Sequence, residues 1–90
     1  MKGKKTVKRY KLVSWYEETA TKEQGLDEIT YNSREKAVSA MKEEYDTSMI
    51  MEADVCEEAC RFDSDAGTAE FWWKDGWIKY WKIVEEARVR

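Results

Sequence analysis

The chain has 90 residues, of which 42% are apolar, 39% charged and 13% aromatic, and its formal net charge is −3. This length suits one domain and is too short for two, and the apolar content excludes an intrinsically disordered chain. No apolar run approaches the length of a signal-peptide core or a membrane span, so we expect a cytoplasmic protein.

Charge is distributed unevenly along the chain. Acids outnumber bases between residues 12 and 70, whereas the charged residues of the first eleven are all basic: Lys2, Lys4, Lys5, Lys8, Arg9 and Lys11. This asymmetry indicates either internal ion pairing or two separate partner surfaces. We expect residues 1–6 to form a flexible basic tail and residues 7–90 to form a single α+β domain.

Two strands are expected in the first third of the chain. The segment VKRYKLVSWYEE, residues 7–18, is rich in β-branched and aromatic residues, which is typical of a strand. A polar connection containing Gly25 follows, and LDEITY, residues 26–31, predicts a second strand antiparallel to the first.

The segment NSREKAVSAMKEEYD has the clearest helix start. Asn32 or Ser33 can cap the helix, and Glu35 stands three residues after Asn32 as a capping-box partner. Apolar residues then recur at spacings of three or four, at Val38, Met41, Tyr45, Met49, Ala53, Cys56 and Cys60. We predict one long helix over residues 33–61. The alternative is a helix that ends near Ile50, followed by a strand over residues 55–62, but Glu and Ala are poor strand residues.

The last third of the chain predicts a β-hairpin. Residues 63–67, DSDAG, form a turn, and Asp75-Gly76 separates TAEFWW from WIKYWKIVEEARV. A two-residue turn pairs Lys74 with Trp77, whereas a three-residue loop pairs Trp73 with Trp77, and both registers remain open. In either register, alternation divides the last strand into two faces: Trp77, Trp81 and Ile83 on one, and Ile78, Tyr80 and Val84 on the other.

The expected fold is α+β, with element order β-β-α-β-β and one long amphipathic helix on one face of a four-stranded antiparallel sheet. Aromatic residues nevertheless point to both faces. A Trp or Tyr side chain offers ~150–250 Å² of surface, and leaving it exposed loses several kcal/mol of hydrophobic stabilisation at ~25 cal/mol per Å². We therefore expect the second face to dock a partner. The alternative is that a curled sheet, the amino-terminal tail and lysine stems cover it.

The residue types argue against an enzyme. The chain has no histidine, which removes the usual general base and every Ser-His or Cys-His arrangement. Cys56 and Cys60 have no second Cys pair to complete a zinc site, and we expect them to be inert core residues. The DSDAG segment is similar to the start of a calcium loop, but its twelfth position is Lys74 instead of glutamate. No catalytic residue, metal or cofactor is predicted.

The sequence allows two opposite relations to nucleic acid. Tryptophans beside lysines can stack on bases, which allows a weak single-strand binder, although the acidic balance opposes it. Conversely, a helix of nearly thirty residues spans ~40 Å. Its acids can imitate a phosphate backbone and face the basic channel of a nucleic-acid-handling enzyme. The simpler interpretation of these acids is a solvated helix face.

Part of the chain resembles a known group of proteins. The segment TYNSREKAVSAMKEEYD followed by WIKYWKIVEEARV is similar to small accessory proteins of phages and integrative elements in gut Firmicutes, through Ser33, Glu35, Ala37, Met41, Trp81, Ile83 and Glu85. The resemblance implies a mobile-element setting, in which small binders inhibit host defence systems, anti-CRISPR proteins among them.

We therefore expect a non-enzymatic protein-binding module or inhibitor, with a basic nucleic-acid-handling enzyme, such as a host defence nuclease, as its partner. A homodimer joined through the open aromatic sheet face is the alternative. No membrane association is expected. The predicted partner-binding residues are Trp72, Trp77, Trp81, Lys79, Glu43, Asp46, Asp54, Glu57 and Glu58.

Overall fold

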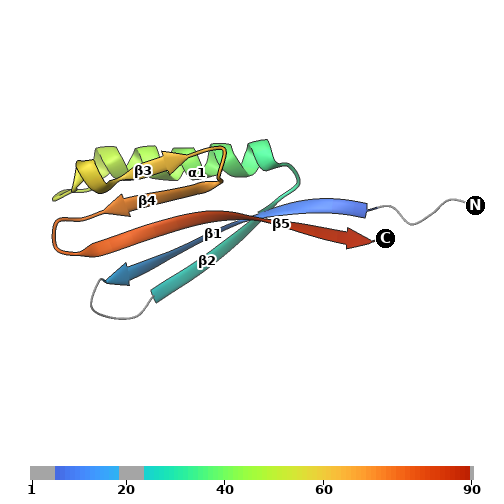
Figure 1. The fold of residues 1–90 in the computed structure, drawn as a ribbon, viewed down its shortest axis with the longest axis horizontal. Coiled ribbons are helices and arrows are strands. Elements are labelled where there is room, and N and C mark those ends of the chain that lie inside the picture. Colours follow the sequence, from blue (N-terminus) through green and yellow to red (C-terminus); the bar gives the residue numbers. More distant parts are fainter. Residues whose placement is uncertain (1–5, 19–23, 90) are drawn as a thin grey trace, which may run out of the picture.

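The computed structural model describes residues 6–18 and 24–89 (Figure 1). Within these residues the chain forms one α-helix and a five-stranded antiparallel sheet. The elements are β1 (Thr6–Glu18), β2 (Gln24–Tyr31), α1 (Arg34–Met51), a 3₁₀ turn η1 (Glu57–Ala59), β3 (Arg61–Asp63), β4 (Thr68–Trp72) and β5 (Trp77–Val89). The predicted α+β class is confirmed. The expected four strands and β-β-α-β-β order are incomplete, because a short strand, β3, follows the helix. Most of the predicted basic tail lies outside the described residues.

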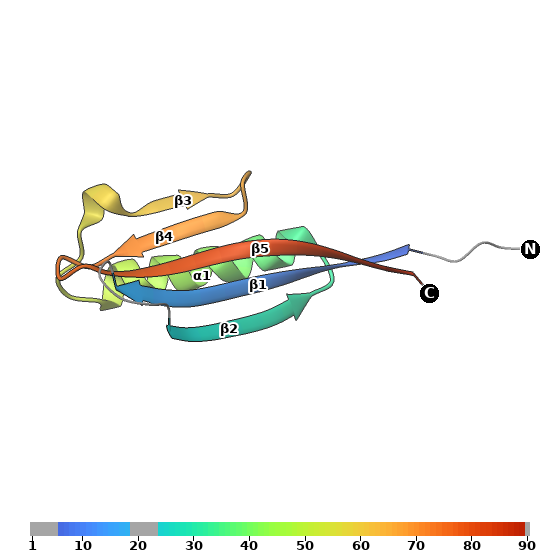
Figure 2. The ribbon, with the colours of Figure 1, turned by 60° about the horizontal axis from the view of Figure 1, so that its bottom comes forward.

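The sheet is built around its two longest strands. Its order is β2-β1-β5-β4-β3, and β1 pairs with β5 along the whole length of both strands, from Thr6 opposite Val89 to Glu18 opposite Trp77. Figure 2 shows α1 behind the sheet, so one sheet face is covered and the other is open. At one end β1 and β5 continue past α1 as a two-stranded ribbon (Figure 2).

The helix begins where the sequence predicts. The Ser33 side chain accepts a hydrogen bond from the Lys36 backbone N–H at 3.1 Å, which identifies Ser33 as the N-cap. The next residue, Arg34, donates from its guanidinium to the backbone oxygens of Ser64 and Asp65, at 2.7 and 2.8 Å. These bonds connect the start of α1 to the turn between β3 and β4.

The predicted helix end is wrong, because α1 stops at Met51 instead of Arg61. Asp54 adopts a left-handed backbone conformation, with φ 57°, and the chain reverses direction there. Val55 then forms a bridge with Trp73, and β3 pairs with β4. A longer helix would leave the outer edge of β4 without these backbone partners, and the sheet hydrogen bonds therefore prevail over helix propensity.

The hairpin adopts the three-residue loop. The Trp73 backbone N–H donates to the Trp77 carbonyl at 2.9 Å, and the Gly76 N–H donates to the Trp73 carbonyl at 3.2 Å. Gly76 has φ 98°, a conformation that glycine adopts without steric cost. Of the two registers that the sequence allowed, the structure has the one that pairs Trp73 with Trp77.

The main core lies between α1 and the covered face of the sheet. Its buried cluster consists of Leu12, Met41, Ala69, Phe71 and Trp81. Trp81 is only 1% exposed, and its indole N–H donates to Glu44 Oε1 at 2.9 Å. The odd-numbered residues of β5 therefore face the helix, and Trp81, which the sequence predicts to contact a partner, lies in the core.

Substituting alanine at Gly67 is expected to lower the free energy of unfolding by about 1–2 kcal/mol, because the left-handed conformation disfavours a side chain. Gly67 has φ 69°, and a Cβ there would lie 3.3 Å from both Arg34 Nη2 and Ile83 Cβ. Urea denaturation followed by circular dichroism measures the loss. Ser64→Ala, in the same turn, should leave the midpoint unchanged. Equal midpoints for both variants would contradict the expected strain.

Candidate functional site

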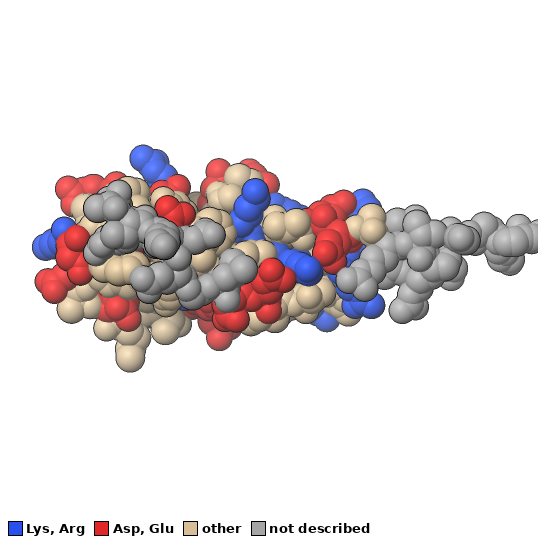
Figure 3. Space-filling model, turned by 90° about the horizontal axis from the view of Figure 1, so that it is seen from below, with Lys and Arg blue, Asp and Glu red and all other residues tan. Residues whose placement is uncertain are grey.

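The open face of the sheet, on the side opposite α1, has an aromatic cluster of its own. Trp15 on β1 lies opposite Tyr80 on β5, and their rings stack with centroids 5.4 Å apart and an interplanar angle of 23°. Trp72 on β4 lies opposite Ile78 on β5. Figure 3 views the molecule from this side and shows acids and bases intermixed among uncharged residues.

The two tryptophans of the open face have their polar atoms satisfied locally. The Trp15 indole N–H donates to Glu17 at 2.7 Å, and that of Trp72 donates to Glu70 at 3.0 Å. In each pair the acceptor lies two residues away on the same strand, and therefore on the same face. Such bonds hold the indoles along the strands and leave their ring surfaces available for packing.

One residue of the open face, Ile78, is buried. Ile78 is only 4% exposed, although no helix covers its side of the sheet. Burial, together with the neighbouring carboxylates of Glu17 and Glu70, raises the pKa of the Tyr80 phenol above its ordinary value. The chain thus already buries Ile78, which weakens the argument that a partner is needed to cover this part of the open face.

A pocket lies at the β4–β5 hairpin end of the sheet. The described residues that line it are Tyr16, Trp73, Asp75 and Trp77, and its volume is about 250 Å³. We call it the hairpin-end pocket. Tyr16 lies opposite Lys79 on the face that α1 covers, and the Tyr16 and Trp73 ring centroids are 6.2 Å apart. The pocket therefore combines aromatic walls from different strands with one carboxylate.

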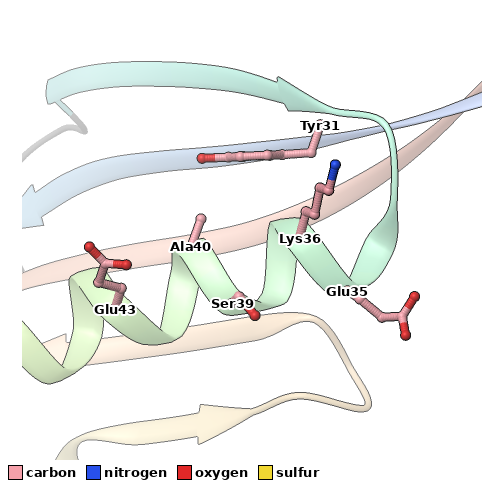
Figure 4. A pocket seen from close by; sticks show the side chains of 6 residues that line it. All are labelled: Tyr31, Glu35, Lys36, Ser39, Ala40 and Glu43. Carbon is pink, nitrogen blue, oxygen red and sulfur yellow. The ribbon is translucent and has the colours of Figure 1, made fainter.

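A second, larger cavity lies between α1 and the edge strand β2, with a volume of about 410 Å³ (Figure 4). We call it the α1–β2 groove, and its lining residues are Tyr31, Glu35, Lys36, Ser39, Ala40 and Glu43. Ile29 is 44% exposed and lies opposite the buried Leu12, so it lies on the same face of the sheet as the groove. The helix crosses the central strands and leaves β2 incompletely covered.

The predicted acidic residues do not form one surface. Glu43 lines the α1–β2 groove, whereas Asp46 pairs with Lys42 at 3.0 Å on the helix surface. Asp54, Glu57 and Glu58 lie beyond the end of α1, in the segment that leads to the opposite edge strand, β3. At 1.5 Å per residue, α1 spans only ~27 Å, so the long acidic rod expected from the sequence is absent from the described residues.

The predicted aromatic residues also occupy separate environments. Trp72 lies on the open face, Trp77 lines the hairpin-end pocket, and Trp81 is buried beneath α1. Lys79 is next to Trp81, with its ammonium 5.0 Å from that ring centroid and 3.8 Å from Glu44 Oε1. Sequence reasoning missed Trp15, Tyr16 and Tyr31, whose roles depend on strand pairings that alternation alone does not reveal.

The cysteines do not share a helical face, since both lie beyond α1, and they are free thiols. Cys60 Sγ accepts a hydrogen bond from the Trp72 backbone N–H at 3.3 Å, and burial raises the pKa of this thiol. Among the described residues, no group of three or more Cys, Asp or Glu is arranged to hold a metal ion. Within the same residues, α1 is not long and apolar enough to cross a bilayer.

Comparison with known protein families, with characterised proteins and with solved structures found no match to this chain.

Proposed function

We propose that the protein is a non-enzymatic protein-binding module that captures a basic protein segment in the α1–β2 groove. The charge of the groove is the observation that carries this proposal. Glu35 and Glu43 line it from α1, and Lys36 is the single base among the described residues that line it. Asp27, exposed on β2, lies on the same face of the sheet as the groove. A lysine-rich or arginine-rich segment complements this acidic excess.

The groove also offers apolar contacts to such a segment. Tyr31 and Ala40 lie across from each other in Figure 4, and Ile29 is exposed on the neighbouring stretch of β2. Aromatic and aliphatic anchors of this kind contribute much of the affinity at protein interfaces, while surrounding charges increase specificity and association rate. An acidic groove repels a phosphate backbone, which favours a protein partner over nucleic acid.

A basic partner agrees with an inhibitory role. Enzymes that handle nucleic acid present basic surfaces to phosphates, and an acidic binder can occupy such a surface. The resemblance to accessory proteins of mobile elements supports a host defence nuclease as the biological partner. The proposed function is therefore blockade of a basic protein surface, with Glu43 as a principal contact.

Charge reversal at Glu43 tests the groove. Glu43→Lys should weaken binding of a labelled peptide of alternating lysine and valine by about fivefold to tenfold, because it replaces an attraction with a repulsion. Fluorescence anisotropy at low ionic strength measures the affinity. Thermal stability should change by no more than about 0.5 kcal/mol, since Glu43 is exposed.

Glu57→Lys is the matched control. It makes the same change in net charge at an exposed residue outside α1 and the groove, and it should retain nearly the parental affinity. Equal losses in both variants would reveal a response to net charge alone, and the groove would then not be the binding site. Unchanged binding in both would also contradict the proposal.

A second copy of the chain on the open face is the second candidate. It is favoured by the intermixed acids and bases of that face (Figure 3), which allow self-complementary pairing. Val84, which strand alternation places on the same face as Tyr80, is 38% exposed and adds apolar surface. Sedimentation velocity over a hundredfold concentration range distinguishes the two candidates. A monomer at every concentration excludes the homodimer and leaves the groove proposal intact.

A further inference from the structure

The geometry points to a binding site for a methylated ammonium group, of the choline or trimethyl-lysine kind, in the hairpin-end pocket. This inference concerns a different site from the α1–β2 groove and does not depend on the function proposed for it. The described part of the pocket has three aromatic walls and one acid, a composition suited to a cation with little hydrogen-bonding capacity. Its volume of about 250 Å³ suits a small head group rather than a larger ligand.

The aromatic walls come from three parts of the sheet. Tyr16 belongs to β1, Trp73 follows β4, and Trp77 begins β5. The Tyr16 and Trp73 rings are inclined at 35° with centroids 6.2 Å apart, so they form a corner instead of a closed stack. Ring faces carry partial negative charge, and a cation within about 6 Å of several centroids is attracted to all of them.

The pocket is held in place before any ligand binds. The Trp73 indole N–H donates to Glu52 at 3.2 Å, and its ring packs edge-on against Phe71 with centroids 4.7 Å apart. Asp75 Oδ1 accepts a hydrogen bond from the Trp77 backbone N–H at 3.1 Å. A preorganised site loses less conformational entropy on binding, which increases affinity for a small ligand.

The surrounding charges favour a cation. Asp75 lines the pocket, and Glu52 lies against the indole N–H of Trp73. One wall already contacts a cation, because the Lys79 ammonium lies 5.0 Å from the Tyr16 centroid. Its charge is compensated by Glu44, whose Oε1 is 3.8 Å away. Lys79 thus brings little net positive charge to the pocket, and among its described lining residues Asp75 is the charged one.

Methylation determines which cations fit. An unmodified ammonium has three N–H donors, and entering a pocket whose walls are mainly aromatic costs it hydrogen bonds with water. A trimethylammonium group has no N–H donor, and its methyl groups contact the ring faces directly. The pocket should therefore prefer the methylated form, with Asp75 supplying long-range attraction instead of a hydrogen bond.

Titration with choline, monitored by the indole signals in ¹H–¹⁵N NMR spectra, tests the inference. The Trp73 and Trp77 signals should shift saturably, while those of Trp15 and Trp72 on the open face stay in place. The uncharged isostere 3,3-dimethylbutan-1-ol should bind at least tenfold more weakly, because it has the same shape without the charge. Equal binding of the isostere, or shifts spread over all tryptophans, would overturn the inference.

Two peptides distinguish the source of the ammonium group. A short peptide containing trimethyl-lysine should bind more tightly than the same peptide with unmodified lysine. If the trimethyl-lysine peptide also exceeds choline, the natural ligand is part of a protein, whereas the reverse order indicates a free small molecule. Equal affinities of the modified and unmodified peptides would contradict the preference for methylation.

Variants separate charge from aromatic contact. Asp75→Asn keeps an oxygen that can accept the Trp77 N–H bond but removes the charge, so choline affinity should fall at least threefold. Trp77→Leu removes one wall and should weaken binding at least tenfold. Asp46→Asn makes the same charge change on the helix surface and should leave choline affinity unchanged. Retained affinity in the Trp77 variant, with its fold intact by circular dichroism, would refute the pocket.

Discussion

Replacing Trp81 with alanine is expected to lower the free energy of unfolding by about 3–5 kcal/mol. Trp81 is among the largest fully buried side chains of the described residues, at 1% exposure. The substitution leaves a cavity beneath α1 and removes the 2.9 Å hydrogen bond from the indole to Glu44. A domain of this size is stabilised by about 5–15 kcal/mol in total, so a large part of its stability depends on this residue.

Trp77→Ala is the matched control for Trp81. Trp77 is half-buried and lines an open pocket at the end of the sheet. Its truncation should lower the free energy of unfolding by about 1 kcal/mol. Both substitutions remove a tryptophan from the same face of β5 and therefore change the fluorescence signal itself. Urea denaturation followed by far-UV circular dichroism is the better measurement. Equal losses in the two variants would mean that the helix does not cover the centre of β5 as described.

The sequence predicted the grouping of residues on β5 but not which group is buried. Period-two alternation separates Trp81 from Tyr80 and Ile78, and the structure agrees. Both groups are aromatic or aliphatic, so composition could not identify the covered face. Strand pairing determines which face of β5 the helix covers. Trp81 lies between two small residues, Ser14 and Ala69, which leave room for an indole beneath α1.

The helix boundary shows how tertiary pairing overrides a local pattern. The apolar spacing that continues through Ala53, Cys56 and Cys60 resembles a helix, yet the Cys56 N–H donates to the Trp72 carbonyl at 2.9 Å. A helix ending near Ile50, the alternative, agrees better with the observed end at Met51, but of the strand expected over residues 55–62 only the last two residues belong to β3. No local signal distinguishes these outcomes, because the partner strand lies more than ten residues ahead.

The sequence could predict some residues of the candidate sites but not which of them lie together. Composition identified Glu43 and Trp77 as candidate contacts, but it grouped them with residues that the fold separates. The groove requires β2 to lie beside the first half of α1, and the pocket requires β1 to reach the hairpin end. Such adjacencies follow from sheet order, in which β1 lies between β2 and β5, and sheet order has no signature in residue spacing.

Ile78→Ala is expected to lower the free energy of unfolding by about 2–4 kcal/mol, a loss usually associated with a residue beneath a helix. Ile78 is 4% exposed on the open face, with Glu17 and Trp72 opposite it on the neighbouring strands. Truncation leaves a void opposite Trp72, whose indole N–H bond to Glu70 restricts movement of that ring into it. Urea denaturation provides the measurement.

Ile29→Ala removes the same atoms from the edge strand β2, where the side chain is 44% exposed, and should cost less than about 1 kcal/mol. The difference between the losses at Ile78 and Ile29 shows whether the open face needs a partner to bury its apolar surface. A large loss at Ile78 means that the monomer already buries the apolar surface of this face, so partner binding there gains little from the hydrophobic effect. A loss no greater than that at Ile29 would mean that burial of Ile78 contributes little to the stability of the monomer. The open face would then again be a candidate docking surface.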